Sequence, residues 1–210
     1  MIKILIVDDH AVVRDGVKKI FEELHGAADF GEAAGAAEAL KLARERDWDV
    51  VLLDLSLGGR SGLEVLKELK QLRPKLPVLI LSMHAEEQYA RRAFKAGAAG
   101  YVTKDSPREE LLRAVKKVTA GGRYVSPTLA EQLVADLERG TDRPPHEALS
   151  NREFEVMLLI ASGKTVGEIA SQLSLSDKTV STYRARILEK MGMKTNAELT
   201  RYAIRNDLVD

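Results

Sequence analysis

The feature that most constrains the fold is an alternation that runs from the first residues to about residue 122. Short runs rich in apolar and β-branched residues alternate with longer stretches whose apolar residues recur at helical spacing. This alternation is typical of βαβ units on a parallel sheet with helices on its faces. We predict strands at residues 3–7, 29–33, 50–54, 78–82 and 99–103, and helices at residues 12–24, 37–46, 63–72, 88–96 and 107–120. Five strands and five helices predict a flavodoxin-like α/β domain.

The helix starts and the linker give the organisation of the rest of the chain. We predict Ser106 as the N-cap of the helix at 107–120, a further helical stretch from Ser126 to about residue 137, and an exposed linker at residues 139–145. After residue 150 no strand pattern is visible, and helices begin at capping boxes or hydroxyl caps and end at glycines. The boxes are Ser150 with Glu153, Thr165 with Glu168 and Thr195 with Glu198; Ser176 precedes a fourth helix, and Gly163 and Gly192 stand at C-terminal caps. We therefore predict domains at residues 1–122 and 148–210, the second of them all-α, joined by a linker with one helix at 123–147.

Composition excludes several classes of protein. Lys plus Arg and Asp plus Glu number 32 each, so any nucleic-acid surface has to be local. The absence of cysteine excludes disulfides and thiolate chemistry. Since no apolar run reaches the length of a membrane span and no signal-peptide pattern is visible, we expect a cytoplasmic protein that does not enter a membrane.

Polar residues of one kind of chemistry follow four of the predicted strands. Because the carboxyl ends of parallel strands line one crevice, these side chains are expected to converge there. Singly, each has an ordinary interpretation as a helix cap, a turn former, a strand-end hydroxyl or a solvated charge. Together they favour a site for a divalent cation and a phosphoryl group. The residues are Asp8 and Asp9, Asp54, Ser82 and Lys104.

The chemistry assigns each residue a role. A carboxylate can accept a phosphoryl group in-line when a cation reduces the repulsion between them, and Asp54, alone at its strand end, is the predicted acceptor. Asp8, Asp9, Asp54 and the backbone carbonyl of Ser56 would hold Mg²⁺, which prefers hard oxygen ligands. Lys104 would pair with phosphoryl oxygens, and the Ser82 hydroxyl would donate a hydrogen bond to them.

These motifs resemble a known family. The sequences Ile6-Val7-Asp8-Asp9-His10, Leu52-Leu53-Asp54-Leu55, Leu81-Ser82-Met83-His84 and Tyr101-Val102-Thr103-Lys104 resemble the receiver domain of bacterial two-component response regulators. The resemblance implies that Asp54 takes phosphate from a sensor histidine kinase, and that Ser82, Tyr101 and Lys104 respond to the modification. It also implies a regulator, and no catalytic residue of an enzyme is expected. Gly58 departs from the proline usual before Gly59, which predicts a more flexible loop after Asp54.

Near the C-terminus, residues 168–173 and 178–187 form two helical stretches with the short connection of a helix-turn-helix. Between residues 146 and 210 basic and acidic residues balance, and the basic excess is confined to the second of these helices. The predicted core is Ile169, Ala170, Leu173, Val180, Ile187 and Leu188. The predicted outward set is Lys178, Ser181, Thr182, Ala185 and Arg186, which suits phosphates and base edges in a major groove.

A second resemblance covers this domain. Residues 149–156, Glu168-Ile169-Ala170, Lys178-Thr179-Val180 and Met191-Gly192 resemble the LuxR-type helix-turn-helix, so the whole chain is similar to response regulators of the NarL/FixJ class. By position, Ser181, Thr182 and Ala185 would face bases, and Lys178, Thr179, Tyr183 and Lys190 would lie near the DNA backbone. Arg184 stands where an apolar residue is common; its stem is expected to pack and its head to reach a phosphate.

Two questions stay open in the sequence. A stripe of Leu199, Tyr202 and Ala203 on the last predicted helix, 197–205, forms either the dimer contact common in this family or packing within its own domain.

The whole chain is interpreted as a phosphorylation-dependent transcription regulator that binds promoter DNA as a homodimer when phosphorylated. The alternatives are a phosphate-carrying adaptor whose helical tail binds protein, and a flavin or nucleotide enzyme; the last is disfavoured because no glycine-rich loop follows the first strand.

Overall fold

A computed structural model describes residues 1–25, 28–57, 60–83, 86–127, 129–131, 144–206 and 208–209. The chain divides into two compact units, Met1–Gln132 and Leu133–Asp210. In the described part of the chain, no helix combines the length and the apolar character needed to cross a bilayer.

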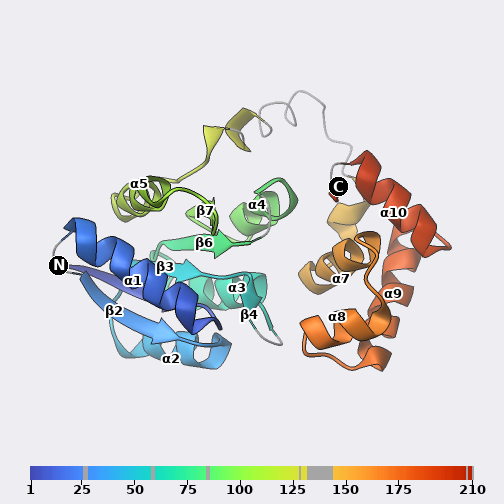
Figure 1. Cartoon of the computed structure of the whole chain (residues 1–210), viewed down its shortest axis with the longest axis horizontal. Coiled ribbons are helices and arrows are strands. Elements are labelled where there is room, and N and C mark those ends of the chain that lie inside the picture. The colour runs from blue at the N-terminus through green and yellow to red at the C-terminus, as the bar shows by residue number, and fades with distance from the viewer. Residues whose placement is uncertain are drawn as a thin grey trace. The chain divides into compact units, whose positions relative to one another are not determined.

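The first unit is built on a five-stranded parallel sheet in the order β2-β1-β3-β6-β7 (Figure 1). This order, with the first strand near the centre, is the flavodoxin-like arrangement, so the predicted fold class is confirmed. All five predicted strands form, with ends within a residue of the predicted ones. They are β1 (Ile2–Val7), β2 (Ala28–Ala33), β3 (Val50–Leu53), β6 (Val78–Ser82) and β7 (Gly100–Thr103).

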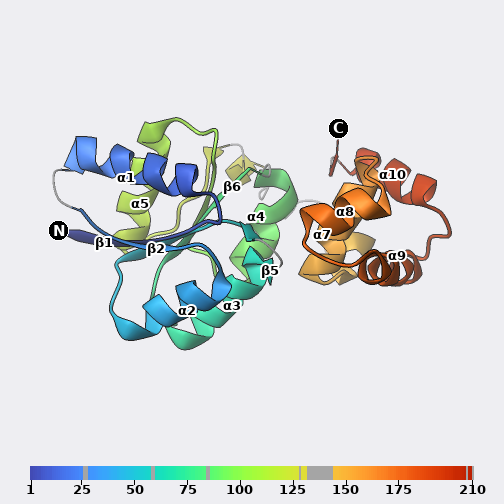
Figure 2. The same ribbon diagram turned by 60° about the horizontal axis from the view of Figure 1, so that its bottom comes forward.

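Helices cover both faces of this sheet (Figure 2). Alternate residues of each strand point to opposite faces, and the set that includes Ile4, Leu52 and Val102 packs with apolar residues of α1 and α5. The other face lies under α2, α3 and α4. The helices are α1 (Ala11–His25), α2 (Ala36–Glu45), α3 (Gly62–Leu72), α4 (Glu86–Lys95) and α5 (Arg108–Thr119). β3, β6 and the last four residues of β1 are buried, which explains why they are continuous apolar runs in the sequence, whereas the edge strand β2 is half-buried over most of its length.

Three local features of the first unit differ from the prediction or extend it. A short antiparallel pair, β4 (Ser56–Leu57) and β5 (Arg60–Ser61), follows Asp54 and was not predicted, because two-residue strands leave no periodic signal. The predicted N-cap Ser106 is wrong: Pro107 occupies that position, and the Ser106 hydroxyl instead lies 2.8 Å from the Thr103 hydroxyl. Gly58, Gly59 and His84, quoted for the receiver resemblance or its departure, lie outside the described residues.

The second unit is all-α in its described residues, as predicted. Its helices are α7 (Asn151–Ala161), α8 (Val166–Gln172), α9 (Asp177–Met191) and α10 (Asn196–Arg205), preceded by the 3₁₀ helix η1 (Pro145–Ala148). Pro145, the last residue of the predicted exposed linker, is exposed and begins η1, and residues 139–143 of that linker lie outside the described residues. The helical stretch predicted to reach residue 137 lies largely outside the described residues.

The caps of the second unit follow the sequence closely. Ser150 with Glu153 and Thr165 with Glu168 form complete capping boxes. Thr195 caps α10 with its hydroxyl, but the Glu198 carboxylate accepts from the Lys194 backbone N–H at 2.7 Å, so the third predicted box is only half formed. Gly163 and Gly192 end their helices with positive φ angles of 83° and 64°, as predicted.

A glycine at the start of α3 determines how closely this helix approaches the backbone of Asp54 and Leu55. A Cβ on Gly62 would lie 2.2 Å from the Asp54 backbone oxygen and 2.6 Å from the Leu55 Cα. We expect Gly62→Ala to lower the free energy of unfolding of the first unit by about 2–3 kcal/mol, because backbone has to move. Gly16→Ala, in open space within α1, should instead raise it by about 0.5–1 kcal/mol. Urea unfolding followed by the fluorescence of Trp48, the one tryptophan of the chain, measures both. Equal stabilities for the two variants would contradict the close approach.

Candidate functional site

The register of the central strands brings two buried carboxylates to one edge of the sheet. The Asp54 backbone N–H donates to the Val7 carbonyl at 2.9 Å, and the Asp8 backbone N–H donates to the Ala33 carbonyl at 3.1 Å. Asp8 and Asp54 therefore directly follow the carboxyl ends of β1 and β3, which are neighbours in the sheet. Both are 3 % exposed or less. The convergence predicted from the strand ends is present in the structure.

Lys104 joins these two carboxylates. Its Nζ lies 2.7 Å from Asp8 Oδ2 and 2.7 Å from Asp54 Oδ2, with its side chain 9 % exposed. Its backbone N–H donates to the Ser82 carbonyl at 2.8 Å, which extends the pairing of β6 with β7 one residue beyond the aligned pair of Ser82 and Thr103. A buried ammonium between two carboxylates satisfies both partly, while the charge of the group remains negative.

The pKa values of Asp54 and Lys104 are both raised, for different physical reasons. Burial raises the pKa of the Asp54 carboxyl above its ordinary value of 3.8; Lys104 opposes this shift, the charge of Asp8 adds to it, and the Ser56 amide opposes it. Burial by itself would lower the pKa of Lys104, but the hydrogen bonds to Asp54 and Asp8 outweigh it, and the pKa is raised. Lys104 is therefore a firmly held cation, and Asp54 a carboxylate whose ionised form is costly.

The donor set around this bridge fits a hard divalent cation. Ligand atoms of Asp8, Asp9, His10 and Asp54 all lie within 4.8 Å of one another. Three carboxylates against one ammonium leave two formal negative charges, and carboxylate oxygens are what Mg²⁺ prefers. In addition, Asp54 Oδ1 is buried without a hydrogen-bond partner among the described residues. A buried oxygen of this kind favours an additional ligand at the site.

The remaining predicted residues lie at varying distances from this cluster. Asp9 belongs to it but is more exposed, with 32 % of its side chain accessible. Ser56 follows Asp54 in β4, and Ser82 ends β6 and is completely buried. Tyr101 is also completely buried, three residues before Lys104, on the face of β7 opposite to Val102 and therefore on the side covered by α4. The structure thus brings Asp8, Asp9, Asp54 and Lys104 together, and places Ser82 and Tyr101 on the strands beside them.

Two residues near the site were not assigned a role from the sequence. The His10 ring lies 2.8 Å from Asp9 Oδ1, and its backbone N–H donates to Asp8 Oδ1 at 2.9 Å. Arg14 donates from Nη1 to the Asp8 carbonyl at 2.8 Å. His10 lies between the strand end and the predicted helix at 12–24, and Arg14 lies in the first turn of that helix, so the short distance of both residues from Asp8 along the chain is the signal that could have indicated them.

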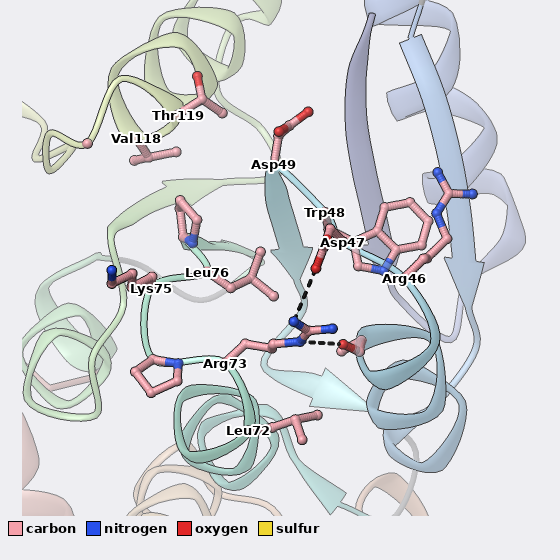
Figure 3. A pocket seen from close by; sticks show the side chains of 14 residues that line it. Arg46, Asp47, Trp48, Asp49, Leu72, Arg73, Lys75, Leu76, Val118 and Thr119 are labelled. Atoms are coloured by element: carbon pink, nitrogen blue, oxygen red, sulfur yellow. Dashed lines mark hydrogen bonds and ion pairs between the residues drawn. The ribbon is translucent and has the colours of Figure 1, made fainter.

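A separate hollow lies at the opposite end of the sheet (Figure 3). Its volume is about 730 Å³, and residues before β3 and β6 line it, including Asp49 and Pro77. Arg73 lies in it with its guanidinium held by Asp47 at 3.1 Å and by the Ala43 carbonyl at 3.1 Å. Because these strands run away from the hollow, it has no part in the phosphoryl site.

In the second unit, α8 and α9 form a helix-turn-helix. The turn between them contains Ser174 in the left-handed region, with φ of 53°, and the Leu175 N–H reaches back to the Ala170 carbonyl at 2.8 Å. This is a Schellman end, in which serine takes the position usual for glycine. Ser176 then caps α9 through the Thr179 N–H.

The faces of α9 agree with the predicted pattern. All the predicted core residues of the helix-turn-helix are buried except Leu188, which is half-buried. The exposed residues of α9 include the whole predicted outward set, namely Lys178, Ser181, Thr182, Ala185 and Arg186. Thr179 and Tyr183 are half-buried beside them. The exposed face thus carries cationic and small polar side chains.

Two basic residues of α9 are engaged within the unit. Arg184 donates from Nε to the Asn196 amide oxygen at 2.6 Å, which ties α9 to the start of α10. Lys190 lies 2.6 Å from Glu153 Oε2, with 42 % of its side chain accessible. In this structure Arg184 and Lys190 therefore hold helices together, whereas Lys178 and Arg186 point outward.

A buried arginine of α7 bonds to the end of α8 and forms an ion pair within its own helix. Arg152 lies 2.7 Å from Glu155 Oε2 and donates to the Leu173 carbonyl at 2.8 Å, and both side chains are 9 % exposed. Leu173 is the C-cap residue of α8, immediately before the turn. The bond from Arg152 therefore fixes where α8 ends relative to α7, and through it where α9 begins.

The stripe on α10 packs within its own unit. Leu199 and Ala203 are completely buried, and the Tyr202 hydroxyl lies 2.7 Å from His146 Nδ1 of η1. The structure therefore supports the intradomain interpretation of these residues. Ile204, half exposed on the same helix, is a different apolar position that solvent reaches.

Two known protein families match this chain, one in each unit. Residues 4–116 match the family described as "Response regulator receiver domain", and residues 147–203 match "Bacterial regulatory proteins, luxR family". The chain belongs to the response regulator family. With this combination of domains it is a response regulator of the NarL/FixJ class.

Curated relatives match over their whole length. The chain is 40 % identical to "Response regulator GacA" of Pseudomonas aeruginosa over 211 residues, covering all of this chain and 99 % of the relative. It is 37 % identical to "Response regulator UvrY" of Escherichia coli over 209 residues, covering 99 % and 96 %. The match is therefore to complete two-domain regulators.

Solved structures that resemble this chain are also response regulators. A LuxR-family two-component response regulator from Aurantimonas is 40 % identical, with a TM-score of 0.60 over 64 % of this chain and 96 % of that one. RcsB from Salmonella enterica serovar Typhimurium, bound to promoter rprA in the presence of the phosphomimetic BeF₃⁻, is 26 % identical, with a TM-score of 0.64 over 96 % and 98 %.

The contact between α7 and α9 predicts an acid-sensitive second unit. Burial alone would raise the pKa of Glu153, but the bonds from Lys190 and Ser150 outweigh it and hold the pKa below its ordinary value of 4.5. The stabilisation is therefore present above pH 4.5 and is lost as the pH falls through the folded-state pKa. We expect Glu153→Gln to cost about 1 kcal/mol at pH 7, and this cost to shrink progressively as the pH falls below 4.5. Thermal unfolding of the full chain, followed by circular dichroism, measures this difference; a difference independent of pH would contradict it.

Proposed function

We propose that this response regulator accepts a phosphoryl group on Asp54 and, once modified, binds promoter DNA through α9. The observation that carries the proposal is the buried Asp54 carboxylate, bridged by Lys104 to Asp8 at the carboxyl edge of the sheet. The donor would be the phosphohistidine of a sensor kinase. An Asp54 oxygen forms the new bond to phosphorus, the bond from phosphorus to the histidine nitrogen breaks, and an acyl phosphate results.

The surrounding residues have distinct roles in this proposal. Asp8, Asp9, Asp54 and the Ser56 carbonyl would hold Mg²⁺, which when bound reduces the repulsion between the carboxylate and the phosphoryl oxygens. Lys104 is close enough to Asp54 to pair with the phosphoryl oxygens after transfer. The Ser82 hydroxyl would donate to the same oxygens, and Tyr101 would respond through its place on the strand that leads to Lys104.

The second unit would read DNA. We propose that Ser181, Thr182 and Ala185 face bases, and that Lys178, Thr179, Tyr183 and Arg186 lie along the phosphate backbone. For Arg184 and Lys190 a phosphate contact would require release from Asn196 and Glu153. Residues 1–122 would act as the receiver, 123–147 as the linker, and 148–210 as the DNA-binding domain of a homodimer in the bacterial cytoplasm.

Phosphorylation is tested first. Incubation of the full chain with a small-molecule phosphodonor and Mg²⁺ should add one phosphoryl group, seen by intact mass, because of the two carboxylates beside Lys104 it is Asp54 that has an oxygen, Oδ1, without a hydrogen-bond partner among the described residues. Asp54→Asn should show no adduct, and a chelator should abolish it in the wild type. An adduct of equal size in Asp54→Asn would place the acceptor elsewhere, and the absence of any adduct with several donors would contradict the receiver role.

DNA binding is tested through its salt dependence. Affinity of the phosphorylated chain for a mixed-sequence duplex should fall steeply with salt, because phosphate contacts release counterions. Lys178→Ala and Arg186→Ala should each weaken binding and lower the slope of log affinity against log salt by about one unit. Lys41→Ala, which removes an exposed charge from α2, is the matched control. A flat salt response would favour the protein-binding adaptor, and unaltered slopes in both α9 variants would contradict this interface.

A further inference from the structure

Arg14 connects three elements around the carboxylates of the phosphoryl site. It lies in the first turn of α1, and its side chain, 15 % exposed, points back toward the strand ends. Its Nη1 donates to the Asp8 carbonyl at 2.8 Å, and its Nε donates to Glu32 Oε2 at 2.9 Å. A single guanidinium thus links the helix, the end of β1 and β2.

The Asp8 carbonyl is part of the peptide that joins Asp8 to Asp9. Because a peptide unit is planar, fixing its oxygen also fixes the direction in which the next residue leaves it. The Asp8 N–H is already held by the Ala33 carbonyl at 3.1 Å. The bond from Arg14 therefore completes the restraint at the carbonyl side and orients Asp9 relative to Asp8.

The Nε of the Arg14 guanidinium is held by the Glu32 carboxylate. Glu32 accepts from Arg14 and also from Lys18 Nζ, at 2.6 Å. The hydrogen bonds from Lys18 and Arg14 lower the pKa of Glu32, so this anchor stays ionised at neutral pH. The planar guanidinium can reach the carboxylate and the carbonyl at once, which an ammonium on a flexible stem does not reproduce.

We propose that Arg14 is a positioning residue of the phosphoryl site, which sets the Asp8–Asp9 peptide and thereby the affinity of the site for Mg²⁺. This inference rests on the proposed function. Arg14 touches neither Asp54 nor Lys104 in any contact found in the described part of the chain, so it acts through the direction of the two metal carboxylates. Outer contacts of this kind commonly change metal affinity tenfold or more.

Lys18 provides a matched control. It is one turn further along α1 and pairs with the same Glu32, and it also lies 2.8 Å from Asp15. Arg14→Met and Lys18→Met each remove one cation from Glu32 and keep an unbranched apolar stem. The contact with the Asp8 carbonyl distinguishes the two.

Calorimetric titration of the full-length variants with Mg²⁺ tests the proposal without measuring phosphorylation. Arg14→Met should raise the Mg²⁺ dissociation constant by about tenfold, and Lys18→Met should leave it within about twofold of wild type. Arg14→Lys, which keeps the charge and loses the fork, should also weaken binding. The Mg²⁺ concentration that gives half-maximal phosphorylation, measured by intact mass, should rise in parallel, while phosphorylation at saturating Mg²⁺ stays near the wild-type level.

Equal dissociation constants in Arg14→Met and Lys18→Met would overturn the proposal. If Arg14→Met fails to unfold cooperatively on heating, the comparison of Arg14→Lys with Lys18→Met decides in its place, and equal affinities there would overturn it as well. A wild-type chain that neither binds Mg²⁺ nor takes up phosphate would instead count against the proposed function. The two failures are therefore distinguishable.

Discussion

The buried contact of Lys104 with Asp8 and Asp54 is the interaction on which the first unit depends. The three groups come from the ends of β7, β1 and β3, so the contact exists only when those strands hold their register. Removal of the lysine would leave two carboxylates buried side by side, which is strongly unfavourable. The charged cluster of Asp8, Asp54 and Lys104 therefore depends on the strand register of the sheet. The buried apolar residues of the strands supply the stability that this cluster does not.

Much of this arrangement could be predicted because it depends on periodicity. Buried parallel strands are apolar runs, and Asp8, Asp54 and Lys104 stand where three such runs end, so a general rule about sheet edges placed them together. The β4–β5 pair was missed because two-residue strands carry no pattern. The role of Arg14 was missed because its partners, the Asp8 carbonyl and Glu32, depend on where α1 passes over β2. The error at Ser106 has a local cause, since Pro107 took the capping position.

In the helix-turn-helix, too, periodicity predicted the buried faces but not the contacts between helices. Helical spacing predicted which side of α9 is buried, and Ser181, Thr182, Ala185 and their neighbours lie on the exposed side. Spacing did not predict that Lys190 pairs with Glu153 or that Arg184 bonds to Asn196, because those partners lie on other helices. A basic residue on a recognition helix thus has two competing uses, and only the packing of the neighbouring helices decides between them.

The raised pKa of Asp54 connects stability with chemistry. Because folding raises this pKa, the folded chain holds the Asp54 proton more tightly than the unfolded chain, so ionisation at neutral pH lowers the free energy of unfolding. A site selected for stability alone would replace such a carboxylate with an amide. The carboxylate is instead retained beside a firmly charged Lys104, whose backbone is bonded to Ser82. A phosphoryl group transferred to Asp54 would add negative charge beside Lys104. The same ammonium that now contacts Asp8 and Asp54 would then rearrange toward the new charge. Because Lys104 directly follows β7, which carries Tyr101, we expect this strand to transmit the rearrangement to the rest of the domain.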